Sequence, residues 1–317
     1  MKKLSIFLTL AICVLFAVSC NKQFDGESAD EAIVTLNLTA DDLTKAYTDG
    51  DGTLAKVLTY KVYLQQGETF VPTQISAKVT VTQYPQALVL RLANSMTYRI
   101  ACFAQSAAAD NAGLFDTTDL DAIAINYDEM LANDDMGDVF CATKEFVATP
   151  GMNESVVMHR PFAQINVCAE DYFDYNLSAM SNVLSQVVMT YHDVPNKFGI
   201  VTGVAGEDRY VPAHVLSSVQ NKTFAAGILG TSRRIGNNLL TLLSMNYLLA
   251  EAEGNTMTVD LTFNALDGTQ VNSVTVTNVP YRANYRTNLY GLLVTNQMRF
   301  SIDISPIFNE PDYNKQY

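Results

Sequence analysis

Residues 20–46, CNKQFDGESADEAIVTLNLTADDLTKA, decide how this chain is organised. Within them, apolar and polar side chains alternate over residues 33–39, which is the period of a β-strand with one face buried. The apolar positions are Val34, Leu36 and Leu38. The sequence therefore predicts an early strand that places these three side chains in a core.

The segment before this strand is typical of export. Two lysines precede an apolar run over residues 4–18, which is too short to span a membrane comfortably and ends at small residues. Cys20 follows at the place of the acylated cysteine of a bacterial lipoprotein. We therefore expect residues 1–19 to be removed as a signal peptide, Cys20 to carry a lipid anchor, and residues 20–31 to form a flexible tether. An ordinary signal peptide, with the cysteine incidental, is the alternative.

Size and charge narrow the class of protein. The chain has 317 residues and is 48% hydrophobic, which suits two domains with real cores. We place their expected bounds at residues 32–156 and 157–317. The formal net charge is −13, which argues against binding to nucleic acid and against electrostatic docking on anionic lipid.

Most of the chain after the tether has strand character. Short alternating runs are separated by turn signals, of which Asp267-Gly268 is the clearest, and long helical periodicities are few. This pattern predicts an all-β fold of β-sandwiches. The runs expected to form strands cover residues 58–64, 78–82, 87–92, 98–104, 257–263, 274–279 and 300–304.

Two stretches differ from this pattern. Residues 106–138 are acidic, carry small residues and have weak strand character, so we expect a long loop with one short helix at a domain end. Residues 237–250, NNLLTLLSMNYLLA, could line a helix or form a fully buried strand, because a continuous apolar run has no decisive period. The flanking glycines favour a strand.

The sequence carries no clear sign of catalysis. The three histidines form no pair at metal-ligand spacing, and no nucleophile elbow, zinc-protease motif, P-loop or dinucleotide fingerprint occurs. The oxygen-rich loops at residues 49–52 and 133–138 do not match a calcium-binding EF-hand. We therefore predict that the protein is not an enzyme and holds no cofactor or metal.

Cysteine usage gives little information about cross-links. Cys102, Cys141 and Cys168 are the cysteines that follow the tether, and the first two lie in apolar runs. We expect all three to be small buried side chains. One disulfide could form in an oxidising compartment, and the sequence does not choose the pair.

The loop expected after the first strand contains a candidate site for proteolytic cleavage. Residues 41–52 are acidic and rich in glycine, with Lys45 as their one basic residue. A protease that cuts after lysine could reach such a loop. A strand that is tied to a membrane anchor and followed by this loop can be removed after folding.

Four segments of the chain carry more specific motifs. They are MHRPFAQINV at residues 158–167, PYRANYRTNLYG at 280–291, IFNEPDY at 307–313 and the TKAYTDG loop at 44–50. These segments resemble the fimbrillin-like, type V pilin-related lipoproteins of Bacteroidales. Together with the lipoprotein pattern at Cys20, they touch the beginning, middle and end of the chain.

This resemblance implies a fold and a mode of assembly. The fold would be two transthyretin-like, immunoglobulin-like β-sandwich domains in tandem. In polymerising members, a trypsin-like protease specific for Arg or Lys cuts the loop at the outer membrane and releases the first strand. A strand of the next subunit then fills the groove, giving a head-to-tail homo- or hetero-polymer. By position, the cut would follow Lys45 and leave a mature chain beginning at Ala46. The donor strand would come from residues 299–317, and we expect Phe300, Ile302 and Ile304 on its buried side.

Three functions compete at this stage. The first is a fimbrial subunit at the cell surface, structural or accessory, that polymerises by strand exchange. The second is an uncut surface-anchored adhesin, or a fimbrial anchor or tip protein, that binds a glycan or a host protein. It is raised because the family's loop commonly carries Arg where this chain has Lys45, so an Arg-only protease would leave it uncut. The third is an anchored hydrolase built from scattered carboxylates.

Overall fold

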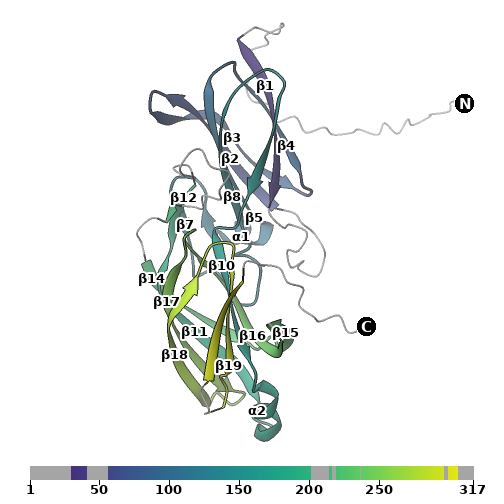
Figure 1. Cartoon of the computed structure of the whole chain (residues 1–317), viewed down its shortest axis with the longest axis vertical. Helices are drawn as coiled ribbons and strands as arrows, with labels where there is room; N and C mark the ends of the chain where they lie inside the picture. The colour runs from purple at the N-terminus through teal and green to yellow at the C-terminus, as the bar shows by residue number, and fades with distance from the viewer. Residues whose placement is uncertain are drawn as a thin grey trace, which may run out of the picture.

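A computed structural model describes residues 30–40, 56–200, 214–215, 219–235, 237–295 and 299–305. It consists of two β-rich lobes stacked along the long axis, with the first lobe at the top of Figure 1 and the second below it. The all-β fold of tandem β-sandwiches predicted from the sequence is confirmed.

The first lobe packs two sheets face to face. One sheet has the strand order β4 (Gln86–Ala93), β1 (Glu31–Ala40), β9 (Met152–Met158). The other has the order β3 (Thr69–Val81), β2 (Lys56–Gln66), β5 (Thr97–Ser106), β8 (Phe140–Val147). Alternate side chains of both sheets meet in one core, as expected for strands with one buried face.

The second lobe is a larger sandwich. One sheet has the order β15 (Thr231–Ile235), β16 (Asn238–Leu249), β10 (Phe162–Ala169), β19 (Arg286–Leu292), β20 (Arg299–Ser305). The facing sheet has the order β14 (Val219–Gly227), β11 (Leu184–Pro195), β17 (Asn255–Ala265), β18 (Gln270–Tyr281). The predicted hairpin at Asp267-Gly268 joins β17 to β18, and Gly268 has a φ of 84°, a conformation that favours glycine.

Within residues 237–250, Asn238–Leu249 form strand β16, as the flanking glycines suggested. From Leu240 onward, β16 is buried on both faces, because its inner face packs on the opposite sheet and its outer face is also covered. A strand that is buried on both sides has no reason to alternate, which explains why its sequence shows no period of two.

Residues 106–138 contain more structure than predicted. The short helix is α1 (Ala107–Ala112), where Ser106 accepts a hydrogen bond from the Ala109 amide. Two short strands follow, β6 (Phe115–Asp116) and β7 (Ile123–Ile125), and pair into a small sheet with β12 (Lys197–Gly199) and β13 (His214–Val215). A second helix, α2 (Tyr172–Ala179), was not predicted either. These strands are too short to show a period in the sequence.

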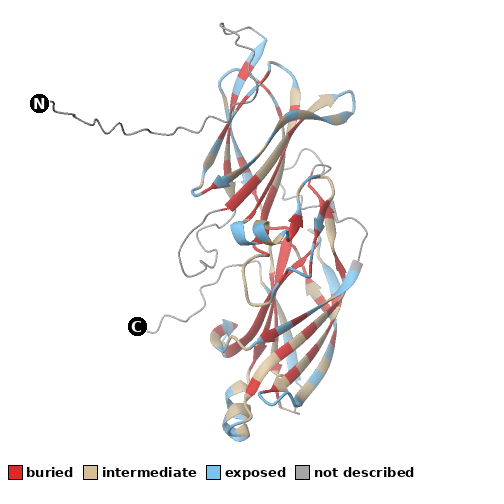
Figure 2. Cartoon of the chain, turned by 180° about the vertical axis from the view of Figure 1, so that it is seen from behind, coloured by how far each residue is buried: buried red, intermediate tan, exposed pale blue. Residues whose placement is uncertain are grey.

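The small sheet joins the two lobes. Its Phe115 and Phe198 pack edge to face against Phe162 of β10, and the same core cluster includes Phe103 of the first lobe. Figure 2 shows buried residues running through both lobes and across the junction between them. The lobes therefore share apolar packing.

The three cysteines are buried, as predicted, and the structure keeps all of them as thiols. Burial raises the pKa of the Cys102 thiol well above its usual value. A buried thiol of this kind behaves as a small apolar side chain.

Candidate functional site: the first strand and the lobe junction

Strand β1 is the central strand of its sheet. It pairs antiparallel with β4, from Glu31 opposite Ala93 to Leu38 opposite Gln86. On its other side it pairs parallel with β9, from Val34 opposite Met152 to Ala40 opposite Met158. Because β4 and β9 meet only through β1 in this sheet, its departure would leave two edges that face a one-strand gap.

The predicted inward positions of β1 are confirmed. Val34, Leu36 and Leu38 are all 0% exposed, as is Ala32. They share one core with side chains of β4, β9 and the facing sheet. The surrounding residues are Leu88, Leu90, Leu92, Val156, Met158, Leu58, Val62 and Ile100. The site is therefore an apolar groove, filled by four alternate residues of one strand.

The outward face of β1 fixes its register. The Asn37 side chain donates to Asn153 Oδ1 at 2.5 Å, while Ile33 is 44% exposed. A slip by one residue would bring Asn37 into the core and expose Leu36, which is why the pairing is strongly specified.

The start of β2 is held by buried charges at the lobe junction. Lys56 Nζ donates to the Asp138 carbonyl oxygen at 2.7 Å and lies 3.7 Å from its carboxylate. Arg160 Nε donates to Asp138 Oδ1 at 2.5 Å, and the guanidinium lies over the Phe140 ring with its carbon 4.5 Å from the ring centroid. We call Lys56, Asp138, Phe140 and Arg160 the junction cluster. Burial by itself would raise the pKa of Asp138, but Arg160 and Lys56 hold it below its usual value.

The carboxyl of Asp135, beside the junction cluster, has a raised pKa, in contrast to that of Asp138. Tyr247 of β16 donates to Asp135 Oδ1 at 2.8 Å. Burial raises the pKa of Asp135 to about 7, against the lowering effect of the Tyr247 hydrogen bond, and the negative charge of Asp138 raises it further. The predicted oxygen-rich loop at residues 133–138 is thus used for internal contacts. Among the described residues, no group of three or more His, Cys, Asp or Glu side chains is placed to hold a metal ion.

This carboxyl makes stability depend on pH. Between about pH 4 and pH 7, Asp135 is ionised in the unfolded chain but protonated in the folded one, so folding takes up a proton. The free energy of unfolding should therefore fall as the pH rises through this window. We expect Asp135→Asn to remove most of that fall while keeping an oxygen for Tyr247, as measured by urea unfolding at pH 5 and pH 7.5. The exposed Glu129→Gln is the control, and an unchanged pH dependence in Asp135→Asn would contradict the assignment.

The two longest motifs of the sequence lie side by side. Strands β10 and β19 are parallel, with Gln164 opposite Arg286 and Asn166 opposite Asn288. Arg286 Nε donates to Gln164 Oε1 at 2.8 Å, and the Asn166 amide donates to Asn288 Oδ1 at 2.9 Å. The motif residues therefore form a buried polar ladder that joins segments 122 positions apart. Their role in the described structure is to fix strand pairing.

Sequence reasoning missed Asp171. This residue, 2% exposed, precedes α2, and its carboxylate accepts hydrogen bonds from the amides of Leu293, Val294 and Thr295 and from the Thr295 hydroxyl. It ties the end of β10 to the turn after β19. An aspartate before a helix suggests a helix cap, and only the fold reveals this different use.

The expectation for the last strand was wrong in one respect. Ile302 lies opposite Leu289, so Phe300, Ile302 and Ile304 do point toward the core side. However, Phe300 and Ile304 are each 41% exposed, and Ile302 is half-buried. Strand β20 is the edge strand of a five-stranded sheet, and the facing sheet has four strands in the described structure, so this edge is incompletely covered.

The predicted lipidation and processing residues lie outside the described residues. These are Cys20, Lys45 and Ala46. Residues 306–317 of the predicted donor segment also lie outside the described residues. The flanks of the loop are described, because β1 ends at Ala40 and β2 begins at Lys56.

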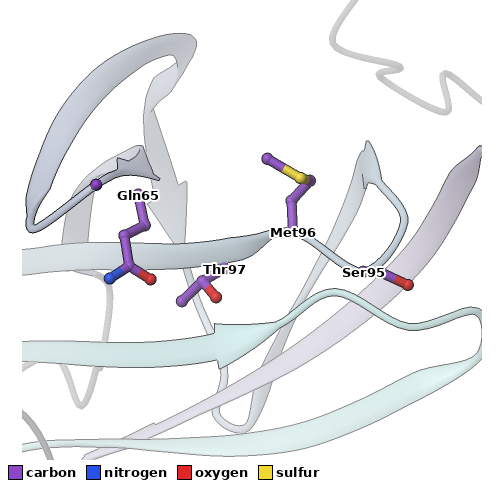
Figure 3. Close-up of a pocket in the computed structure, with 5 residues that line it drawn as sticks. Gln65, Ser95, Met96 and Thr97 are labelled. Atoms are coloured by element: carbon purple, nitrogen blue, oxygen red, sulfur yellow. The ribbon is translucent and has the colours of Figure 1, made fainter.

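An open hollow of about 280 Å³ lies at the turns that join β2 to β3 and β4 to β5. Figure 3 shows Gln65, Ser95, Met96 and Thr97 around it, and Gly67 completes the lining. The lining offers one amide and two hydroxyl groups and carries no charge. Separately, no helix in the described part of the chain is long and apolar enough to cross a membrane.

Comparison with known proteins gives a family and several solved structures. The model of a family of unknown function, DUF6562, matches residues 21–317. No curated protein matches the chain. A candidate adhesin of Bacteroides thetaiotaomicron VPI-5482 is similar in structure with a TM-score of 0.49 and 12% identity, over 89% of this chain and 98% of that one.

Two fimbrial proteins of Porphyromonas gingivalis are also similar. The anchor protein Mfa2 has a TM-score of 0.44 and 9% identity, over 87% of this chain and 98% of its own. The tip protein Mfa3, truncated at its C-terminus, has a TM-score of 0.39 and 10% identity over the same shares.

Proposed function

The chain belongs to the family of unknown function DUF6562, and we propose that it is a fimbrial subunit, structural or accessory, at the bacterial cell surface. It is exported as a lipoprotein anchored through Cys20. A protease that cuts after Lys45 then releases β1, and a strand of a neighbouring subunit takes its place. The neighbours are other fimbrial subunits, and the polymer grows head to tail.

The observation that supports this proposal best is the place of β1. It is bonded on both sides, its four inward residues are 0% exposed, and it precedes the loop that carries Lys45. An extended segment with apolar residues at alternate positions could restore both the backbone hydrogen bonds and the burial. Because donor and groove lie at different places on each subunit, such contacts propagate instead of closing.

The released-strand step can be tested with Lys45→Ala. The variant is expected to keep its N-terminal segment, to stay on the membrane and to form no fimbriae. N-terminal sequencing, intact mass and electron microscopy of cells of the native host measure these outcomes. Lys22→Ala, which changes a lysine of the tether before β1, is the matched control and should be processed normally. Unchanged fibres in Lys45→Ala would rule out cleavage at this loop as the switch.

A second function is favoured by the hollow at the end of the first lobe. The amide and hydroxyl groups of Gln65, Ser95 and Thr97 are suited to hydrogen bonds with the hydroxyls of a sugar. In this alternative the chain stays uncut and acts as an adhesin or as a fimbrial anchor or tip protein that binds a glycan or host protein. A wild-type chain recovered with Cys20 as its first residue would support it, and a glycan array without any bound sugar would count against it.

A further inference from the structure

The residues that flank the Lys45 loop, Ala40 and Lys56, both connect to the region around residues 158–160. Ala40 does so by strand pairing, and Lys56 does so through buried side-chain contacts. At one end, Ala40 pairs with Met158 at the last position of the β1–β9 ladder. At the other end, Lys56 reaches Asp138, which is also bonded to Arg160, two residues beyond Met158. Both ends of residues 41–55 are therefore fixed on the short segment that leads from the first lobe to the second.

The contacts that hold β1 differ in kind from those that hold the start of β2. The hold on β1 consists of backbone hydrogen bonds and apolar side chains, which any strand with the same alternation could supply. Strand β2 is paired on both sides, with β3 and β5, and its first residue is also held by a specific side chain. Lys56 is 7% exposed, donates to the Asp138 carbonyl and lies 3.7 Å from the Asp138 carboxylate. If Lys56 left, a buried carbonyl would lose its donor and a buried carboxylate one of its two cations, which is strongly unfavourable.

The junction cluster also faces the second lobe. Asp138 lies three residues after Asp135, whose carboxyl accepts a hydrogen bond from the Tyr247 hydroxyl of β16, and Arg160 lies two residues before the start of β10. Lys56 is thus connected to both lobes through a few buried contacts. Strand β1 makes its ladders only with strands of the first lobe.

We propose that the junction cluster is a retention clamp that keeps the start of β2 in place when the loop after β1 is cut. Strand β1 is then free to exchange for another strand, whereas Lys56 keeps the start of β2 in place against the second lobe. Lys56, Asp138 and Arg160 are positioning residues in this step. The inference rests on the proposed function, because it concerns what remains after cleavage.

The test cuts the exported full-length chain in solution with a lysine-specific endoprotease. Lys45 is the only lysine or arginine between residues 41 and 55, so one cut opens this loop. Hydrogen exchange followed by mass spectrometry then reports on the β2 amides before the cut and after it, while the severed β1 is still bound. The variants are Lys56→Met, which keeps the apolar stem, and Asp138→Asn. Lys144→Met, which breaks an exposed ion pair with Glu154 in the same lobe, is the matched control.

While the severed β1 is still bound, exchange of the β2 amides in the wild type and in Lys144→Met should stay within about threefold of its value before the cut. In Lys56→Met it should become at least about tenfold faster after the cut, and only after it. Equal protection of β2 in Lys56→Met and wild type after the cut would overturn the clamp, as would loss of β2 protection in the wild type. If β2 of Lys56→Met is already loosened in the uncut chain, the cluster is a general stabiliser and the proposal is wrong. Asp138→Asn removes the carboxylate that Lys56 contacts, and it should have the same effect on β2 exchange as Lys56→Met.

The exchange experiment in solution tests the clamp whether or not the chain is cut in its native host. If native chains still begin at Cys20, the proposed function fails while the result in solution still decides the clamp. If native chains begin at Ala46 and β2 unravels in the wild type, the function stands and the clamp fails.

Discussion

A chain that begins at Ala46 is expected to lose the cooperative unfolding of its first lobe. Without β1, the core lacks Val34, Leu36 and Leu38, each fully buried in the intact protein. Burial of three such side chains contributes about 6 kcal/mol in total. This is comparable to the whole stability of a small domain. The lost hydrogen bonds to β4 and β9 add to the effect.

The measurement is urea unfolding followed by far-ultraviolet circular dichroism, with intact chain as the reference. A synthetic peptide of residues 30–40, added in trans, should restore the lost transition. The same peptide with Leu36→Asp should fail to do so, because a carboxylate cannot enter an apolar groove at low cost. If the shortened chain unfolds with the same midpoint as the intact one, β1 does not support the first lobe and the strand-release function loses its basis.

Asp171→Ala is expected to destabilise the second lobe by about 4 kcal/mol. The carboxylate accepts bonds from three backbone amides and one hydroxyl, and each bond to a buried charge is worth about 1.5–3 kcal/mol. Its loss leaves the amides of Leu293 and Val294 buried without an acceptor, because both residues are at most 2% exposed. A change of this size is unusual for a single substitution.

Equilibrium unfolding in urea measures this effect, with Asp174→Ala in the first turn of α2 as the control. Asp171→Asn should give an intermediate loss, because the amide keeps one of the two oxygens. If Asp171→Ala costs no more than the control, the turn after β19 does not depend on this carboxylate.

The local alternation of apolar and polar residues was enough to predict the strands that have one buried face. Val34, Leu36 and Leu38 alternate with polar residues because water lies on one side of β1 and a core on the other. The Asp267-Gly268 hairpin follows from the positive φ that its glycine adopts. Where both faces are buried, as in β16, the pattern disappears, and flanking glycines were the only guide.

The sequence by itself therefore determined the fold class and the first strand with its inward side chains. Only the tertiary structure showed which residues from distant parts of the chain contact one another. The pairing of Asn166 with Asn288, the bonds from Asp171 to residues 293–295 and the contact of Lys56 with Asp138 each join residues at least 82 positions apart. The exposure of Phe300 and Ile304 depends on how many strands the facing sheet has. A period of two records which way a side chain points, but the partner it meets there is set by strands from elsewhere in the chain.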